Sequence, residues 1–443
     1  MTFRFLLICL SCLLFACTPK LGASSPSNLA KESPASPPKL GIGEVLDPDL
    51  LSIQFGIKGL VLAEPIVQLG QAAEVELNFD VLGEDIREFR YDIVHCDKGW
   101  EPSQLNPSDY LEKFSEGDIR DYDLAFNTVS NYTHYNLSLP NQFVSWTKSG
   151  NYLLNVYDDD TGDLVMRLRF CVSEQLVTLD INSTRPGSVA RDKTHQEFDV
   201  GLDLSQSRLE NPRRTLTLSV IQNGDWRTGI YDLAPRFIRD DNLLWDYQNK
   251  LTFAAHREWR TLDIRTLRSA GGRVEEIRRD DDIFYIYLAP DPVRVDFPFE
   301  TRIDLNGKYV IENFDNPSGV DDQRNFNLQS EYTTALFTLK MPRDESIEPL
   351  YLYGGLTNYQ MNDLNEGKYN SLLNAYMFST PLKQGFYNYA YVSADKAGFA
   401  PNWDPIEGNT FQTENTYSFL LYYRPYGERY DRLISYSYKQ VNR

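Results

Sequence analysis

Residues 149–173 read SGNYLLNVYDDDTGDLVMRLRFCVS, and this stretch decides the fold class. Apolar side chains recur at every second position on both sides of an acidic centre. A period of two places them on one face of a strand. The centre, DDDTGD at 158–163, has the composition of a tight turn. The stretch therefore predicts a β-hairpin.

The same alternation recurs in other parts of the chain. It is clear over 216–220, 333–339 and 417–423. The run Ile283–Leu288 is continuously apolar or aromatic, which is typical of a strand buried on both faces. Long helical periodicity is nearly absent. We therefore expect an all-β protein built from short strands.

Length and composition indicate several compact domains. The chain has 443 residues, of which 42% are hydrophobic, and its 28 Tyr and 24 Phe favour strands. A typical domain has about 100–200 residues. We expect three tandem immunoglobulin-like β-sandwiches, at 45–175, 176–325 and 326–443.

The N-terminus predicts export and lipid attachment. Arg4 precedes an apolar run from Phe5 to Ala16, which is shorter than the about 20 residues that a membrane-spanning helix needs. A cysteine, Cys17, follows this run directly, as in the cleavage box of bacterial lipoproteins. We expect residues 1–16 to be a lipoprotein signal peptide and Cys17 to carry the lipid that holds the protein on a membrane. Residues 17–44, rich in Ser, Pro and Ala, are expected to be a flexible linker.

The charge excludes one class of partner. The formal net charge is −19, so the phosphates of nucleic acids should repel the chain. We expect no nucleic-acid partner.

Two cysteines remain in the expected mature body, Cys96 and Cys171. They could form a disulfide in an oxidising compartment, or they could be small buried apolar residues, which is the favoured interpretation. The spacing of the cysteines does not fit a zinc site. His95 adjoins Cys96, but neighbouring residues of a strand point to opposite faces, so the two cannot form a nucleophile–base pair.

No other motif indicates chemistry. Asp158, Asp160 and Asp163 could attract calcium, but they are more simply interpreted as a solvated turn. The known hydrolase, metalloprotease and phosphate-loop motifs do not occur. We expect a non-enzymatic protein with no catalytic residue, metal, cofactor or small-molecule substrate. Tyr359 and Trp403 lie in Asn-containing segments and could stack on sugar rings, which leaves a glycan-binding lipoprotein of a polysaccharide uptake system as the alternative.

Eight segments together resemble one family. They are YDIVHCDKGW (91–100), YTHYNLSLPN (132–141), SGNYLLNVYDDD (149–160), REWRTLDIRTLR (257–268), LNGKYVI (305–311), LKQGFYNYAYV (382–392), IEGNTFQTENTY (406–417) and YYRPYGERYDRLI (422–434). The pattern is similar to that of the plug protein of the type IX secretion system of Bacteroidetes. Residues 253–256, Phe-Ala-Ala-His, depart from the family pattern, which has more Gly and Asn there.

The resemblance implies a role and a location. A plug protein of this family closes the periplasmic opening of the large outer-membrane translocon barrel when no cargo passes. The expected partner is therefore that barrel, and the expected location is the periplasmic face of the outer membrane. Thr18-Pro19-Lys20 after Cys17 lacks the acidic residues that accompany surface export of lipoproteins in these bacteria.

Overall fold

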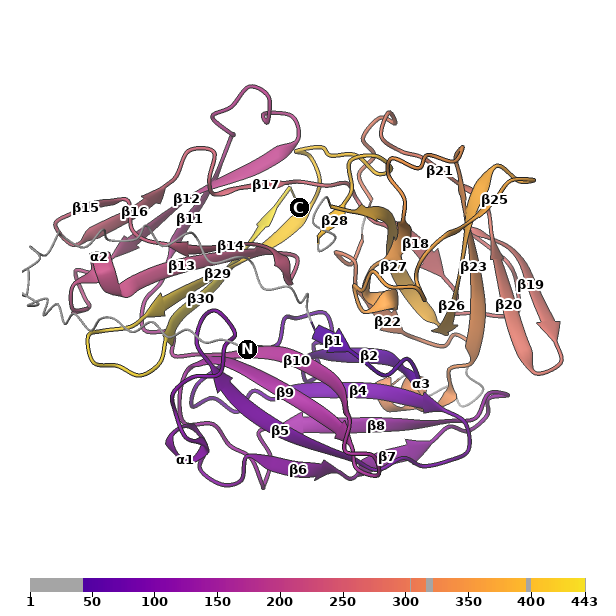
Figure 1. Ribbon diagram of the computed structural model, residues 1–443, viewed down its shortest axis with the longest axis horizontal. Coiled ribbons are helices and arrows are strands. Elements are labelled where there is room, and N and C mark those ends of the chain that lie inside the picture. Colours follow the sequence, from indigo (N-terminus) through magenta and orange to yellow (C-terminus); the bar gives the residue numbers. More distant parts are fainter. Residues whose placement is uncertain (1–42, 303, 316–321, 396–399, 443) are drawn as a thin grey trace, which may run out of the picture. The chain divides into compact units, whose positions relative to one another are not determined.

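The computed structural model describes residues 43–302, 304–315, 322–395 and 400–442. Within these ranges most elements are strands, which form six sheets (Figure 1). The helices are short: α1 Pro107–Tyr110, α2 Pro212–Thr215, α3 Gln323–Gln329 and the 3-10 helix η1 Gly355–Thr357. None of the helices in the described part is long and apolar enough to cross a membrane. The predicted all-β class is confirmed.

The first sandwich packs a six-stranded sheet, in the order β1-β10-β9-β5-β6 with β3 beside β10, against a four-stranded sheet in the order β2-β4-β8-β7. Its strands are β1 Gly43–Val45, β2 Leu50–Ile57, β3 Ile66–Gln68, β4 Val75–Leu82, β5 Phe89–Cys96, β6 Glu116–Ile119, β7 Asp121–Leu124, β8 Tyr132–Leu139, β9 Gly150–Asp158 and β10 Leu164–Ser173.

The predicted hairpin is the pair β9 and β10. Tyr152 and Leu154 are fully buried and lie opposite Phe170 and Leu168 in the antiparallel register. The rings of Tyr152 and Phe170 stack with their centroids 5.1 Å apart. Gly162 has a φ of +76°, a conformation that glycine adopts without strain, so it fits the turn. The alternating apolar residues of this stretch therefore form the inward face of the sheet.

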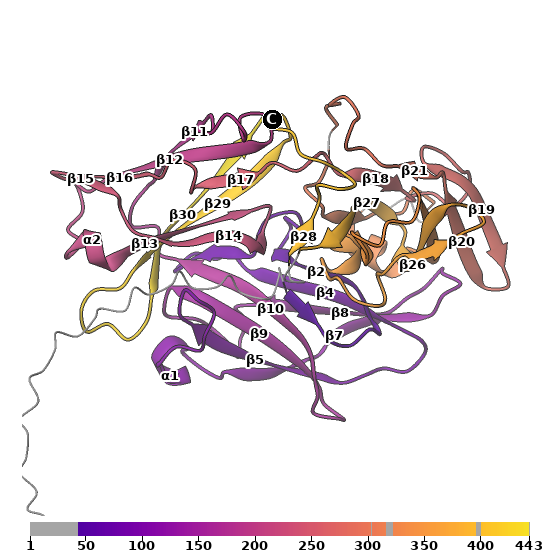
Figure 2. The same ribbon diagram turned by 45° about the horizontal axis from the view of Figure 1, so that its top comes forward.

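The middle sandwich consists of a five-stranded sheet, in the order β11-β12-β16-β15 with β17 beside β12, and a four-stranded sheet in the order β14-β13-β29-β30. Its strands are β11 Asp180–Thr184, β12 His195–Asp203, β13 Leu216–Gln222, β14 Asp225–Leu233, β15 Phe237–Arg239, β16 Asn242–Asp246, β17 Thr252–Ala254, β29 Asn415–Tyr423 and β30 Arg432–Val441. The last two strands come from the C-terminus, and Figures 1 and 2 show them in yellow beside β13.

The third sandwich comes from the chain between β17 and β29. One sheet has the order β18-β27-β22, with β24 and β28 also beside β27, and the other has the order β19-β20-β23-β26-β25, with β21 beside β23. The strands are β18 Arg260–Asp263, β19 Val274–Asp280, β20 Ile283–Leu288, β21 Asp291–Pro292, β22 Tyr309–Ile311, β23 Tyr332–Lys340, β24 Leu350–Tyr353, β25 Lys368–Asn370, β26 Ala375–Lys383, β27 Gly385–Ala394 and β28 Pro401–Asn402.

Strand pairing corrects two expectations. The boundary expected at 325–326 falls inside the third sandwich, because β20 pairs with β23 across it. The C-terminal segment expected to complete the third domain instead supplies β29 and β30 to the middle sandwich. The third sandwich is therefore inserted into the middle one. β20 is also buried on one face only, since Ile283 is 47% exposed while Ile286 is buried.

Candidate functional site: the interfaces between the sandwiches

The first and middle sandwiches meet through the outer faces of two sheets. Residues of β5, β9 and β10 pack there against residues of β13, β29 and β30 in one hydrophobic cluster. Trp100 and Trp226 meet edge to face across this interface, with ring centroids 4.6 Å apart. The two sandwiches therefore share an apolar interface of the kind that holds domains in one arrangement.

A polar clamp fixes the same interface, and three of the family-like segments supply it. The side-chain oxygen of Asn151 accepts a hydrogen bond from the hydroxyl of Tyr422 at 2.7 Å. Arg424 pairs with Asp97 at 3.1 Å. A carboxylate oxygen of Asp431 accepts a hydrogen bond from the backbone N–H of Lys98 at 3.1 Å. Segments 91–100, 149–160 and 422–434 thus meet here, although they are distant in the sequence.

The first and third sandwiches meet around a buried ion pair. Lys383 at the end of β26 lies 2.6 Å from Asp80 of β4, and both side chains are 1% exposed. The carboxylate of Asp80 also accepts a hydrogen bond from the hydroxyl of Tyr332 at 2.6 Å, and His134 lies 2.6 Å from its other oxygen. Burial alone would raise the pKa of Asp80, but Lys383 and His134 hold it below its ordinary value. Burial lowers the pKa of Lys383 although Asp80 opposes this.

Two family-like segments, 257–268 and 406–417, meet where the chain crosses between the middle and third sandwiches. Arg260 of segment 257–268 forms a bidentate salt bridge with Glu407 of segment 406–417, with N–O distances of 2.9 and 3.1 Å. Arg260 also pairs with Asp291 at 2.9 Å, and Arg294 donates to Glu407 at 2.7 Å. Burial would raise the pKa of Glu407, but Arg260 and Arg294 lower it to about 2.

A second buried acid lies beside this network. Glu258 is 2% exposed, and its Oε1 accepts a hydrogen bond from the backbone N–H of Glu414 at 3.1 Å, while its Oε2 has no partner among the described residues. Asp304 is its neighbour, and the two carboxylate oxygens of Asp304 already accept backbone N–H groups of Trp259 and Asn306 at 2.7 and 2.8 Å. Burial, with the nearby charge of Asp304, raises the pKa of Glu258 to about 8. Glu258 is therefore protonated at neutral pH.

The structure places Cys96 and Cys171 at the first interface as buried free thiols. Both lie opposite Asn151, one on each neighbouring strand. Strands lie about 4.8 Å apart, so the two Cα atoms are about 9–10 Å apart, whereas a disulfide needs less than about 7 Å. The geometry excludes the disulfide that the sequence left open. Cys17 lies outside the described residues.

The other candidate residues take structural roles. His95 lies beside Ser103 and the carbonyl of Ser149, at 2.8 and 3.1 Å, and burial raises the pKa of Cys96 to about 12, which leaves the thiol un-ionised. Within the described residues no three His, Cys, Asp or Glu side chains come together as a metal site. Tyr359 and Trp403 are only 8% and 4% exposed, so neither offers a surface platform for a sugar.

Asp80, Lys383, Glu258 and Glu407 are buried in or beside these contacts, but no local sequence motif distinguishes them. Asp80 and Lys383 lie within strands at positions that local alternation assigns to solvent. A signal was present, because Lys383 is the single charged residue in the stretch 375–392. Long-range pairing alone could have shown that another sandwich covers these positions.

The fold and these interfaces define a class: a multi-sandwich β-protein whose characteristic segments hold its domains together. Residues 50–174 match the family model of the type 9 secretion system plug protein 1st domain. The resemblance to type IX secretion system plug proteins is thus confirmed, and the chain carries the first domain of that family.

Solved structures give a second comparison. A hypothetical protein from Parabacteroides merdae superimposes with a TM-score of 0.84 at 28% identity, over 91% of this chain and 100% of that one. The C-terminal domain of the Streptococcus pyogenes antigen I/II-family protein AspA gives a TM-score of 0.15 at 8% identity, over 90% of this chain and 100% of that one, which is too low to inform the fold. No curated protein matches at a significant level. The arrangement of all three sandwiches therefore recurs in a protein from another source.

Proposed function

We propose that this chain is a non-enzymatic lipoprotein that closes the periplasmic opening of the outer-membrane translocon barrel of the type IX secretion system while no cargo passes. The observation that carries the proposal is the match of residues 50–174 to the plug family's first domain. That family and the all-β fold suggest a non-enzymatic component of the secretion apparatus in the cell envelope.

The contacts between the sandwiches support the proposal that the protein acts as a lid. A body that closes a wide pore has to keep its shape, and each pair of sandwiches here is held by buried polar or ionic contacts, which include a hydrogen bond from the hydroxyl of Tyr353 in β24 to Asp225 in β14 at 2.7 Å. Lys383, Asn151 and Tyr422, which take part in two of these contacts, lie in family-like segments. A lipid on Cys17 would restrict the search for the barrel to a thin layer along the membrane and so raise the local concentration of the lid.

The glycan-binding alternative loses its basis in the structure. It depended on exposed aromatic side chains, and Tyr359 and Trp403 are buried. Protease treatment of intact cells separates the two roles, because a periplasmic lid is protected whereas a glycan receptor on the cell surface is digested.

Deletion of the gene tests the proposal. Cells that lack the lid should take up a large antibiotic such as vancomycin, and the wild-type gene should restore the barrier. A Cys17→Ala variant, which cannot carry the lipid, should restore it only partly. Unchanged uptake in deleted cells whose translocons are present and idle would refute the plug role. Purification of the tagged chain in mild detergent should recover the barrel.

A further inference from the structure

A groove runs along the junction between the first and third sandwiches. Residues 45–52 form one wall, and residues 355–365 and 379–382 form the other. Its volume is about 710 Å³. Leucines and prolines line much of it: Leu46, Pro48, Leu51, Leu356, Leu364 and Pro381. A cleft of this size and composition is suited to a flexible apolar ligand.

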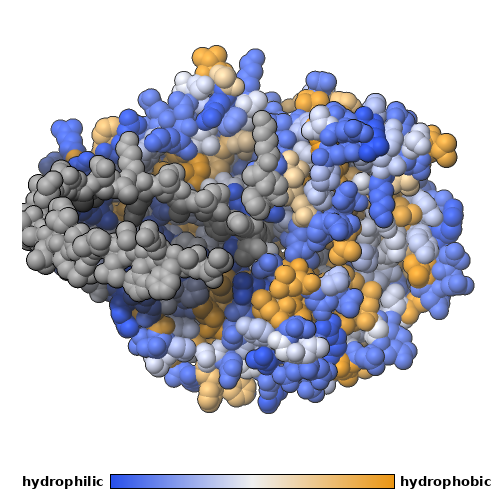
Figure 3. Space-filling view, in the orientation of Figure 1, coloured by the Kyte–Doolittle hydropathy of each residue, from blue (hydrophilic) through white to orange (hydrophobic). Residues whose placement is uncertain are grey.

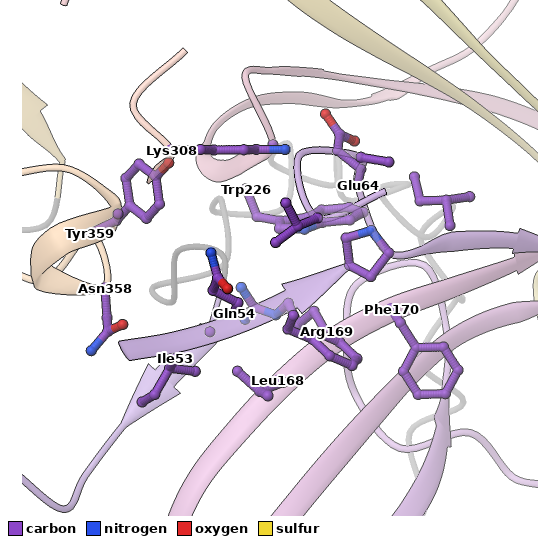
Figure 4. Close-up of a pocket in the computed structure, with 18 of the residues that line it drawn as sticks. Ile53, Gln54, Glu64, Leu168, Arg169, Phe170, Trp226, Lys308, Asn358 and Tyr359 are labelled. Carbon is purple, nitrogen blue, oxygen red and sulfur yellow. The ribbon is translucent and has the colours of Figure 1, made fainter. Parts of the chain in front are cut away.

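The groove continues into a smaller cavity of about 110 Å³, which we call the socket. Val45, Tyr309, Gly355 and Asn358 line both spaces. Apolar side chains of the first sandwich, with Trp226 of the middle one, form most of the socket's lining, and the charged side chains of Glu64, Arg169 and Lys308 also border it (Figure 4). An apolar cavity of about 150 Å³ takes up benzene, so the socket has room for a small ring or a branched aliphatic side chain.

One buried polar group beside the socket, the hydroxyl of Tyr359, is left without a hydrogen bond in the part of the chain that the structure describes. The residue is 8% exposed, and its hydroxyl has no hydrogen-bond partner among the described residues. Figure 4 shows it on the side of the socket opposite Trp226. Its φ of +54° is costly for a bulky residue. A buried hydroxyl without a partner is also costly, and an occupant with a polar atom would remove that cost.

Exposed leucines border both spaces. Leu60 and Leu62 are 62% and 38% exposed and alternate with Val61 and Ala63, which line the socket. Leu46 and Leu364, beside the groove, are 49% and 65% exposed. In Figure 3 hydrophobic residues gather over β1 and β2, near the middle of that face. An apolar rim around an apolar pocket is typical of a protein contact.

The charges along the groove give it a direction. Asp47 and Asp363 are among its lining residues, and none of the described lining residues is a Lys or an Arg. Asp47 is already paired with Arg87 at 2.8 Å, whereas Asp363 is exposed and does not line the socket. A basic side chain of an occupant is therefore favoured near Asp363.

We propose that the groove and socket bind one extended segment of a partner polypeptide. The segment places an aromatic or branched side chain in the socket, further apolar side chains along the groove, and a basic residue at the Asp363 end. A polar atom next to the socket residue completes the hydrogen bonding of Tyr359. This assignment stands on the groove alone and does not depend on the plug role.

Selection from a library of random peptides displayed on phage tests the proposal with the full mature chain. The enriched peptides should combine apolar residues with a terminal Lys or Arg. A synthetic fluorescent copy of the best peptide should bind the Leu60→Ser, Leu62→Ser, Leu364→Ser triple variant at least tenfold more weakly than the wild type in an anisotropy titration. These side chains are exposed, so the variant should fold.

Two leucines outside the groove provide the matched control. A Leu372→Ser, Leu373→Ser variant removes side chains that are 94% and 55% exposed, and it should bind like the wild type. Asp363→Asn should weaken only peptides with the basic residue. Tyr359→Phe should weaken binding without a change in the peptide's consensus.

Three results would overturn the proposal. One is that no enriched peptide distinguishes the wild type from the triple variant. Another is that peptides bind only after removal of residues 1–42, which would assign the groove to the chain's own N-terminal segment. The third is concentration-dependent self-association that the triple variant abolishes, which would assign it to a second copy of the chain.

Discussion

Replacement of Glu258 by Gln should make the protein more stable in mildly alkaline solution. Glu258 is buried beside Asp304, and its pKa is raised from 4.5 to about 8. An unfolded chain ionises this residue above about pH 4.5, whereas the folded protein holds it neutral until about pH 8. The free energy of unfolding is therefore not reduced by Glu258 below about pH 4.5. The reduction grows as the pH rises and is complete above about pH 8.

The magnitude follows from the change in proton affinity. A rise from 4.5 to about 8 corresponds to a loss of about 5 kcal/mol at about 1.4 kcal/mol per pH unit. This value is a ceiling, since water that enters the site reduces it. Gln has the shape of the neutral acid and can donate its N–H to Asp304. We expect Glu258→Gln to match the wild type at pH 5 and to exceed it by about 2–5 kcal/mol at pH 9.

Urea unfolding followed by tryptophan fluorescence between pH 5 and pH 9 measures the effect. The relevant quantity is the difference between variant and wild type at each pH, because groups other than Glu258 and its neighbour Asp304 titrate alike in both proteins. Glu275→Gln is the matched control, since Glu275 is exposed on β19. A difference between Glu258→Gln and wild type that is the same at pH 5 and pH 9 would refute the raised pKa of Glu258.

Three further predictions concern the interfaces. Lys383→Met should destabilise the protein by about 3–5 kcal/mol in urea unfolding because it leaves Asp80 buried without its cation, and adding Asp80→Asn should recover most of the loss. Cys96 and Cys171 should react with a thiol reagent only after the protein is unfolded, and the mature chain should then show two free thiols under non-reducing conditions. A protein mass lower by two hydrogens would indicate a disulfide and contradict the free-thiol geometry. Deletion of residues 415–443 should unfold the middle sandwich, as measured by limited proteolysis, because β29 and β30 form half of one of its sheets; an intact middle fragment would contradict the pairing.

Local patterns were sufficient to predict the strands. Alternation in 149–173 is a property of adjacent residues, so the hairpin, its turn and its inward face could be predicted without knowledge of the rest of the chain. The pairing of β13 with β29 could not be predicted in this way, because the two strands are about 200 residues apart. The local pattern of each strand would suit any other strand of similar pattern equally well. The domain boundaries depended on such pairings, which is why two of them differ.

The interface residues were hidden for a related reason. A charged side chain on the outer face of a strand has the same sequence pattern whether water or another sandwich covers it. Asp80 and Lys383 are both such cases, and only their proximity shows that they form a pair. Tyr359 and Trp403 are the opposite case. Their polar neighbours in the sequence indicate exposed loops, but other segments of the chain cover both side chains.

The inserted topology explains why the ion pairs can matter beyond their small net energies. A buried ion pair contributes little compared with an apolar contact of the same shape, but a partner left alone is costly, so only one docking geometry is tolerated. The third sandwich is joined to the middle one by two chain crossings, near 255–260 and 403–415, and Arg260 and Glu407 bind each other across them. A swing about a single linker is therefore excluded, and any displacement of the third sandwich has to distort both crossings and break the buried hydrogen bond from the Tyr353 hydroxyl to Asp225. Such a body changes position as a unit, which is what the closing and opening of a pore by a tethered lid requires.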